Sequence, residues 1–173
     1  MKNIQELFRS IKPEEIQSNI FSLIGKEWFL ITAGTEKEFN TMTASWGMAG
    51  ILWNKPIFVS YVRPTRHTYL FMQEADIFTI SFIGENREAI HKICGSKSGR
   101  DTNKIKESGL RPVLTERGNI SFEQANLVLE CRKIYFDDLK PVYFLPDDID
   151  EVFYPNQDYH RVYYGEILNV YTR

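Results

Sequence analysis

The sequence predicts a mainly β fold with a few added helices. Short runs rich in β-branched and aromatic residues recur along the chain, which is typical of strands. Glycine, proline and asparagine separate these runs, so turns are expected to join neighbouring strands. The length of 173 residues suits one domain with a single core. Together these observations indicate an antiparallel barrel or sandwich formed by residues 1–173.

The expected strands are short and apolar. They cover residues 28–32, 57–62, 77–82, 127–131 and 162–168. Turn signals lie between them at Ala33-Gly34-Thr35, Asn54-Lys55-Pro56, Arg63-Pro64 and Arg117-Gly118-Asn119.

Helical spacing of apolar residues predicts helices between these strands. They cover residues 65–74, 86–94 and 101–107. In the second, Ala89, Ile90 and Ile93 form the expected inner face, and Asp101 is the expected cap of the third. A further helical pattern covers residues 13–24, although serine and asparagine interrupt it.

The composition is that of a globular protein, with 43% hydrophobic and 25% charged residues. A net charge of −2 gives no general attraction for nucleic acid or for an anionic membrane. No apolar run approaches the roughly 20 residues of a membrane-spanning helix, and the start of the chain lacks a secretory pattern. Cys94 and Cys131 lie far apart without CxxC spacing. We therefore expect a cytoplasmic protein with reduced thiols, no metal site, no nucleic-acid partner and no membrane association.

The run Asn40-Thr41-Met42-Thr43-Ala44-Ser45-Trp46-Gly47 lies beside strong β sequence but is poor core material. In an extended chain, its hydroxyls, main-chain N–H groups and small side chains would accept a flat polar ligand at close range. An isoalloxazine ring is a flat polar ligand of this kind. An ordinary hairpin with Thr and Ser on its solvated face has the same composition, so both interpretations stand.

The segment Tyr61-Val62-Arg63-Pro64-Thr65-Arg66-His67-Thr68-Tyr69 combines a strand end, a proline turn and an expected helix start. Arginine forks and the free N–H groups of a helix start both favour a phosphate. Arg63 and Arg66, with the hydroxyls of Thr65 and Thr68, are candidates to share one dianion. The alternative is a solvated loop with two exposed arginines. We interpret His67 as a helix-start or surface residue rather than a catalyst.

The segment Cys94-Gly95-Ser96-Lys97-Ser98-Gly99-Arg100-Asp101 is rich in hydrogen-bond donors. It either closes over a phosphate or nicotinamide through Lys97, Ser98 and Arg100, or forms a turn that Asp101 caps. The GxxxxGK[ST] spacing of a P-loop is absent. Cys94 is interpreted as an inert thiol because no motif pairs it with a histidine and an acid.

His160 stands at the polar entrance of the last expected strand, and the turn Tyr154-Pro155-Asn156 brings Tyr154 and Tyr159 towards the same place. His160 either contacts a ligand there or is an ordinary loop-end histidine. The chain shows no paired carboxylates, no metal-ligand cluster and no Ser-His-Asp order. These features favour a ligand-binding site over a site for general acid–base catalysis.

Taken in order, these motifs resemble the flavin reductase-like family with the FMN-binding split barrel, which includes flavoredoxins. The resemblance covers nearly the whole chain from Phe21. It rests on the segments NTMTASWG, WNKP, VRPTRHTY, FTISF, CGSKSGRD, LVLECRKIY and DYHRVYYGEI.

The resemblance implies an antiparallel Greek-key split β-barrel that forms a homodimer with FMN near the subunit interface. It implies that residues 41–46 line the flavin ring and that residues 63–68 and 97–100 bind the ribityl phosphate. His160 would lie near the open face of the flavin. The implied cofactor-binding residues are Asn40, Thr41, Met42, Thr43, Ala44, Ser45, Trp46, Arg63, Thr65, Arg66, Thr68, Lys97, Ser98 and Arg100. The implied substrate-side residues are His160, Tyr159 and Tyr154.

Many members of the family reduce flavin with NADH or NADPH, so the resemblance implies an NAD(P)H:flavin oxidoreductase. Hydride would pass directly to the flavin, and no catalytic acid or base would be needed. Main-chain N–H groups of residues 41–46 are expected to donate where reduced flavin gathers negative charge. Because GxGxxG is absent, an FMN-bound electron carrier with a redox protein as partner stays open. A non-enzymatic ligand-binding barrel is the third interpretation.

Overall fold

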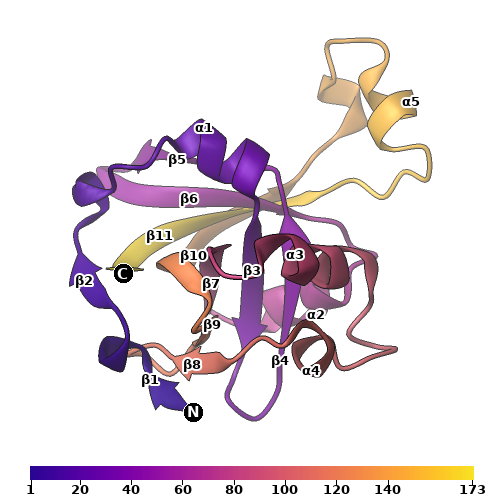
Figure 1. Cartoon of the computed structure of the whole chain (residues 1–173). Helices are drawn as coiled ribbons and strands as arrows, with labels where there is room; N and C mark the ends of the chain where they lie inside the picture. The colour runs from indigo at the N-terminus through magenta and orange to yellow at the C-terminus, as the bar shows by residue number, and fades with distance from the viewer.

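A large antiparallel sheet dominates the computed structural model, which describes residues 1–173 (Figure 1). Its strands are β2 (Arg9–Ile11), β3 (Phe29–Gly34), β4 (Phe39–Ala44), β5 (Gly47–Leu52), β6 (Lys55–Val62), β7 (Ile77–Ile83), β10 (Ala125–Asp138) and β11 (Arg161–Thr172). The order is β4-β3-β7-β10-β11-β6-β5, and β2 pairs with β11. The predicted mainly β class and its antiparallel pairing are confirmed.

The sheet curls strongly. Four ladder steps separate β3 from β6, so in a flat sheet these strands would lie about 19 Å apart. Instead the rings of Phe29 on β3 and Phe58 on β6 have centroids 5.2 Å apart, edge to face. Phe82 on β7 packs against both rings. The strands thus wrap around one aromatic core, while no ladder joins the two end strands, β4 and β5.

A small sheet covers the outer face of the central strands. It contains β1 (Lys2–Asn3), β8 (Pro112–Leu114) and β9 (Ile120–Phe122), in the order β1-β8-β9. Thr79 Oγ1 donates to the carbonyl of Ile120 at 2.5 Å, and Ser81 Oγ lies 3.0 Å from Ser121 Oγ. Hydrogen bonding therefore satisfies the polar residues of β7 that the second layer buries.

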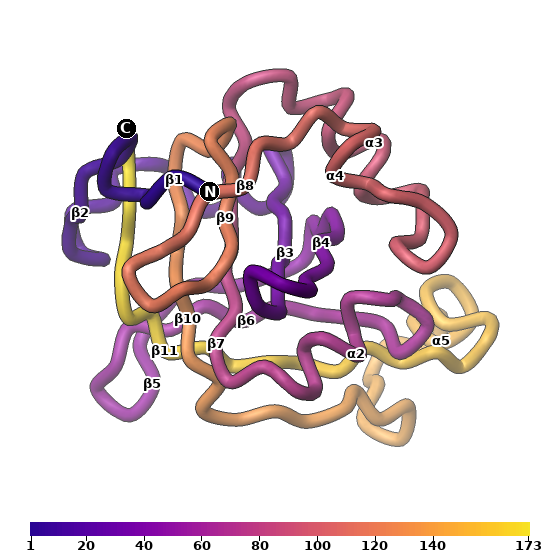
Figure 2. Tube along the Cα trace, turned by 90° about the horizontal axis from the view of Figure 1, so that it is seen from below, coloured from indigo at the N-terminus to yellow at the C-terminus, as the bar shows by residue number.

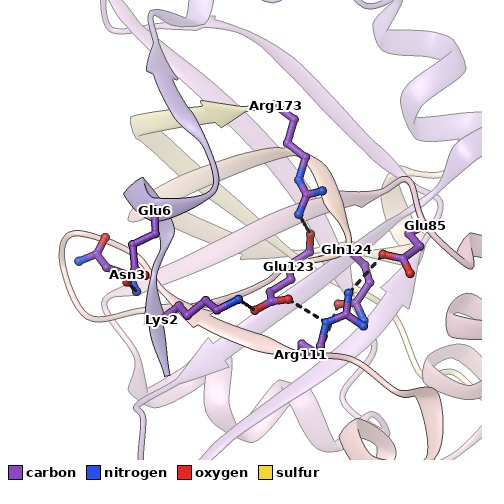
Figure 3. A network of polar contacts seen from close by, with 8 residues as sticks. All are labelled: Lys2, Asn3, Glu6, Glu85, Arg111, Glu123, Gln124 and Arg173. Carbon is purple, nitrogen blue, oxygen red and sulfur yellow. Dashed lines mark hydrogen bonds and ion pairs between the residues drawn. The ribbon is translucent and has the colours of Figure 1, made fainter.

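A surface network ties both chain ends to this small sheet (Figure 3). Glu123 accepts from Lys2 at 3.0 Å and from Arg111 at 2.8 Å, and Arg111 also contacts Glu85 at 3.2 Å. Arg173 donates to the main-chain carbonyl of Glu123. Such exposed pairs contribute little individually, so their main effect is to fix where the termini lie.

The structure has five helices, three of which lie at one edge of the large sheet. The helices are α1 (Ile20–Ser22), α2 (His67–Glu74), α3 (Arg87–Ser96), α4 (Lys104–Ser108) and α5 (Ile149–Phe153). Helices α2, α3 and α4 lie beside β4, whereas α5 belongs to an excursion between β10 and β11 that projects from the body (Figures 1 and 2). Short 3-10 turns cover Ile4–Glu6, Pro13–Glu15 and Pro141–Tyr143, and a π-turn covers Leu23–Glu27. None of the helices has the length and apolar character needed to cross a membrane.

The expected helix over residues 13–24 is wrong. The structure has separate short turns there, and Asn19 caps α1 by accepting from the main-chain N–H of Ser22 at 3.1 Å. Asn19 and the preceding serine favour a cap over a helix interior because their side chains compete for main-chain groups.

Three finer helix predictions also need correction. Helix α2 begins at His67 rather than at residue 65, because Arg66 is still extended. Asn103, not Asp101, caps α4 by accepting from the N–H of Lys106. On α3 the buried residues are Ile90, His91 and Cys94, while Ala89 is exposed.

Candidate functional site

A pocket of about 200 Å³ opens between the end of β4, the end of β6 and the start of β11. Its walls come from segments that are far apart in the sequence but that the curled sheet brings together. The lining residues are Met42, Thr43, Ala44, Ser45, Trp46, Tyr61, Arg63, Arg66 and His160. We call it the ring pocket. Five of its residues belong to the predicted small-residue run, and three more were also candidates from sequence.

The first two residues of that run have structural roles. The amide of Asn40 donates to Thr68 Oγ1 at 2.7 Å, which links β4 to α2. Thr41 Oγ1 donates to the carbonyl of Ile31 at 3.2 Å and lies 2.9 Å from Thr32 Oγ1. Their side chains are therefore held inside the fold, outside the ring pocket.

The main chain of β4 nevertheless faces the site. The ammonium of Lys104 donates to the carbonyl of Thr41. In an antiparallel strand the N–H and C=O of one residue point to the same side, and this side alternates along the strand. The bond from Lys104 therefore places the main-chain groups of Thr41 and Thr43 on the edge of β4 that has no partner strand.

Thr43 is held by α3. Its Oγ1 donates to the carbonyl of His91 at 3.2 Å and lies 3.0 Å from His91 Nδ1. Burial, with a smaller contribution from Arg87, lowers the pKa of His91 to about 4, so this imidazole is neutral at pH 7. His91 thus fixes the one hydroxyl that β4 presents to both α3 and the ring pocket.

Aromatic residues surround His160 at the mouth of the ring pocket. Its Nδ1 lies 2.8 Å from the hydroxyl of Tyr154, and its ring centroid lies 5.0 Å from that of Trp46. Burial first, and then the charge of Arg63, lower the pKa of His160 to about 4. Tyr159 is turned away, because its hydroxyl donates to Asp150 at 2.9 Å.

The two arginines of the predicted phosphate turn have different partners. Arg63 donates to the Asp158 carboxylate at 2.6 Å and to the carbonyl of Phe153 at 2.8 Å. Arg66 donates only to a neutral carbonyl, that of Gly95, at 2.9 Å. Arg66 therefore keeps a positive charge without a carboxylate partner, whereas the charge of Arg63 is balanced.

A second pocket, of about 100 Å³, adjoins the ring pocket beyond Arg66. We call it the cationic cradle. Its lining residues are Met42, Thr65, Arg66, His67, Thr68, Ser96, Lys97, Ser98 and Lys104. Three of them are cations and none is a carboxylate. Lys97 pairs with Glu107 outside the cradle, but Arg66 and Lys104 have no such partner.

Two features of the cradle indicate room for a further acceptor. Lys104 is 5% exposed, and burial lowers its pKa, with a smaller contribution from Arg66. His67 Nδ1 is buried without a hydrogen-bond partner. An anion in the cradle would accept from unused donors of Lys104 and relieve the repulsion between the cations.

The loop of residues 97–101 forms one wall of the cradle through Lys97 and Ser98. Arg100 donates to the carbonyl of Thr65 at 3.3 Å, while Ser98 Oγ accepts from the N–H of Arg100 at 3.2 Å. At Gly99 a Cβ would lie 2.2 Å from Asn40 Oδ1, so only glycine lets the loop approach β4 this closely.

Sequence reasoning missed Lys104, Tyr61 and His91, and it did not name His67 among the cofactor-binding residues. Lys104 and His91 lie in helices whose distance from β4 no local pattern reveals. The one available signal for Lys104 was a cation immediately after the Asn103 cap of a short helix, on the side where the helix meets the sheet.

Comparisons with known proteins show the family and the fold of this chain. A model of the flavin reductase like domain matches residues 21–173. No curated protein sequence matches the chain.

Solved structures share the fold. An FMN-binding protein from Thermus thermophilus with bound 1-cyclohex-2-enone has 19% identity and a TM-score of 0.66, covering 94% of this chain and 79% of that one. A flavoredoxin from Methanosarcina acetivorans has 19% identity and a TM-score of 0.65, covering 95% and 76%. An NADH:FAD oxidoreductase from Streptomyces globisporus C-1027, in complex with NAD and FAD fragments, has 16% identity and a TM-score of 0.63, covering 85% and 74%.

At these identities the structural likeness shows the fold alone. The domain match over most of the chain goes further and confirms the resemblance that the motif order indicated. This chain belongs to the flavin reductase-like family.

Proposed function

We propose that this protein binds FMN and transfers hydride from NADH or NADPH to the flavin. The observation that supports this most directly is the junction of the ring pocket and the cationic cradle, which share Met42 and Arg66. A flat polar ring system with a phosphate on a short tether matches such a pair of pockets in both shape and charge.

The residues present fit the phosphate of FMN. Arg66, Lys97 and Lys104 supply positive charge, the hydroxyls of Thr65, Thr68 and Ser98 are available beside them, and His67 Nδ1 has no other partner. In the ring pocket, the open edge of β4 offers the N–H group of Thr43 to the polar rim of the ring. Met42 and Trp46 provide apolar contact.

The bound flavin would supply the redox chemistry, and the protein would supply orientation and electrostatics. His160 would orient the nicotinamide at the pocket mouth. Its Nδ1 is engaged by Tyr154, so Nε2 is the nitrogen left to hydrogen bond with a ligand. Because His160 is neutral at pH 7, it orients by hydrogen bonding and adds no charge.

The visible spectrum of the purified protein tests this function. With FMN added, flavin bands should remain after desalting, and anaerobic NADH or NADPH should bleach them within seconds. A protein that retains no FMN, or whose bound FMN is not reduced by either nucleotide, would contradict the proposal. Arg66→Ala should weaken retention more than Arg63→Ala, whose charge Asp158 already balances.

We further propose that the protein is a homodimer with a split β-barrel in each subunit. The end strand β5 carries the exposed apolar residues Met48 and Ile51, with Trp46 before it and Trp53 after it. An unpaired strand edge with such side chains needs cover. A second copy over β5 would also narrow the ring pocket at Trp46. Light scattering should give a mass in solution equal to two chains. The variant Ile51→Lys should reduce this mass to that of a single chain.

A second candidate function is an FMN-bound electron carrier for a redox protein. Trp46 and Phe153 favour it, because both are about two-fifths exposed at the pocket mouth and would offer a protein partner an aromatic surface. Stopped-flow mixing separates the two functions, because bound FMN in a carrier would not be bleached by NADPH. We place either activity in the cytoplasm and in a single domain of residues 1–173.

A further inference from the structure

Trp28 has a main-chain conformation that residues with side chains rarely adopt. Its φ is 63° and its ψ is 177°, in a region that glycine almost alone populates. Such strain persists only where the surrounding structure holds it, and it is common at functional sites. The indole is 43% exposed, so burial in the core does not explain the conformation. Trp28 stands directly before Phe29 of β3, which pairs with Ala44 beside the ring pocket.

The strained Trp28 packs against His91 of α3. The two ring centroids lie 6.0 Å apart with the planes at 75°, which is an edge-to-face contact. His91 is 3% exposed, and its Nε2 is buried without a hydrogen-bond partner. Burial lowers the pKa of His91 to about 4. Trp28 thus helps to keep water away from an imidazole that is neutral at pH 7.

The contacts between Thr43 and His91 select the tautomer of this imidazole. Thr43 Oγ1 donates its single proton to the carbonyl of His91 at 3.2 Å, and it lies 3.0 Å from Nδ1. If Nδ1 carries the imidazole proton, both contacts are hydrogen bonds, and the buried Nε2 keeps an unused lone pair. If Nε2 carries it, one contact is lost, and a buried N–H has no acceptor. The first arrangement is favoured, because buried N–H groups without a partner are rarer than buried acceptors without one.

In this arrangement the hydroxyl of Thr43 can only accept a further hydrogen bond. Its proton points to the carbonyl of His91, and one of its lone pairs accepts from Nδ1. The second lone pair stays available, and Thr43 lines the ring pocket. A ligand group that meets this hydroxyl must therefore bring an N–H or an O–H. The main-chain N–H of the same residue adds a donor beside this acceptor.

An acceptor in the ring pocket distinguishes the two redox states of a flavin. Hydride transfer from NADH or NADPH brings two electrons and one proton to N5 and leaves the oxidised nicotinamide. N5 then changes from a hydrogen-bond acceptor into an N–H donor, next to the carbonyl oxygen at C4, which accepts in both states. Thr43 directly follows Met42, which the ring pocket shares with the cradle. This position favours N5, in the ring that carries the ribityl chain, over the imide N–H of the next ring.

We propose that His91 and Trp28 are positioning residues that hold the hydroxyl of Thr43 as an acceptor, so that the protein favours reduced flavin over oxidised flavin. Thr43 contacts the flavin, His91 acts through Thr43, and Trp28 acts through His91. The inference rests on the proposed flavin site and adds how that site discriminates between the two states of its cofactor.

Two measurements on the full chain give its affinity for both states. Fluorescence titration gives the affinity for oxidised FMN, and the midpoint potential of bound FMN, measured anaerobically against a reference dye, then gives the affinity for reduced FMN. Thr43→Val should weaken the binding of reduced FMN about five- to ten-fold, which lowers the midpoint potential by about 20–30 mV. The affinity for oxidised FMN should change by less than about two-fold, since no hydrogen bond to that state is lost.

Variants of His91 test its role as a positioning residue. His91→Leu should lower the midpoint potential in the same direction as Thr43→Val. His91→Asn should restore it, because the amide N–H can take the place of Nδ1–H. The matched control is Thr32→Val, which removes a buried strand hydroxyl outside the ring pocket and the cradle. It should leave the midpoint potential unchanged.

Nitrogen chemical shifts of the ligand-free protein give a readout that needs no flavin. They should show the imidazole proton of His91 on Nδ1. Trp28→Ala, which uncovers the imidazole, should raise the pKa of His91 towards its ordinary value. A proton on Nε2, or a pKa that Trp28→Ala does not change, would overturn the inference.

The outcomes with FMN separate this inference from the function on which it rests. Equal weakening of both redox states in Thr43→Val, or an unchanged midpoint potential, would overturn the inference and leave the flavin site standing. A potential in His91→Asn as low as that in His91→Leu would also overturn it. A wild-type protein that binds no FMN would overturn the proposed function as well.

Discussion

The ammonium of Lys104, at the start of α4, donates a hydrogen bond to the main-chain carbonyl of Thr41 on the open edge of β4. This contact links a helix to a strand that lies 63 residues earlier in the chain. Lys104 is buried, it has no carboxylate partner, and burial lowers its pKa. A buried cation so arranged is costly on its own, and the phosphate that we propose for the cationic cradle would offset that cost.

Replacing Lys104 by methionine should weaken FMN binding roughly 10- to 100-fold, because one charged hydrogen bond contributes about 1.5–3 kcal/mol. The ligand-free protein should not lose stability to the same extent, because a buried charge is removed at the same time. Fluorescence titration and urea denaturation measure the two effects. Lys92→Met on the exposed face of α3 is the control. Unchanged FMN affinity in Lys104→Met would show that Lys104 does not bind the cofactor.

His91 should make the fold sensitive to mild acid. Its folded-state pKa is about 4 against an ordinary value of 6.5, so the folded protein binds fewer protons than the unfolded chain between these values. Neutral His91 contributes fully to the free energy of unfolding above pH 6.5, and this contribution is lost as the pH falls towards 4. The loss between pH 7 and pH 5 is about 2 kcal/mol. In His91→Gln the difference in unfolding free energy between pH 7 and pH 5 should shrink by about that amount. Urea denaturation at both pH values measures it, and a difference equal to that of the wild type would contradict the assignment.

Tyr154→Phe should release His160 from its fixed orientation. The change removes the hydroxyl 2.8 Å from His160 Nδ1 and should cost about 1 kcal/mol of stability. Nitrogen chemical shifts of the imidazole should then show a mixture of tautomers in place of one. Tyr159→Phe is the matched control, because its hydroxyl bonds Asp150 instead. If both variants leave the His160 signals unchanged, the Tyr154 bond does not set the tautomer.

Gly99→Ala should push the loop of residues 97–101 away from β4. The added Cβ would lie 2.2 Å from Asn40 Oδ1, so either the loop or the Asn40 amide must move, and the bond from Asn40 to Thr68 is at risk. We expect weaker FMN binding, with little change in the packing of the core residues that lie away from this loop. Gly25→Ala is the control, since a Cβ there meets nothing within 4 Å. Wild-type affinity in Gly99→Ala would show that the close approach is not needed for binding.

The sequence patterns predicted five strands of the large sheet and most of the ring pocket. The runs in β3, β7 and β10 are apolar because these strands are buried on both faces, and such runs are visible locally. The strand β5 reads Gly47-Met48-Ala49-Gly50-Ile51-Leu52, and it was missed because two glycines interrupt its apolar residues. The residues at the ring pocket were largely found, because a polar run beside a strand is conspicuous. Lys104 was not, because its role follows from a contact with β4 that only the complete fold creates.

The sheet that brings Phe29 within 5.2 Å of Phe58 has a mechanical consequence for ligand entry. One wall of the ring pocket belongs to β4 and the other to β6 and β11, towards opposite ends of an unclosed ladder. Because no ladder joins β4 to β6, a change in the curl of the sheet would alter the width of the ring pocket without breaking a ladder between those two walls. The edge-to-face contact between Phe29 and Phe58 opposes such a change, so the packing of the core sets the width of the ring pocket.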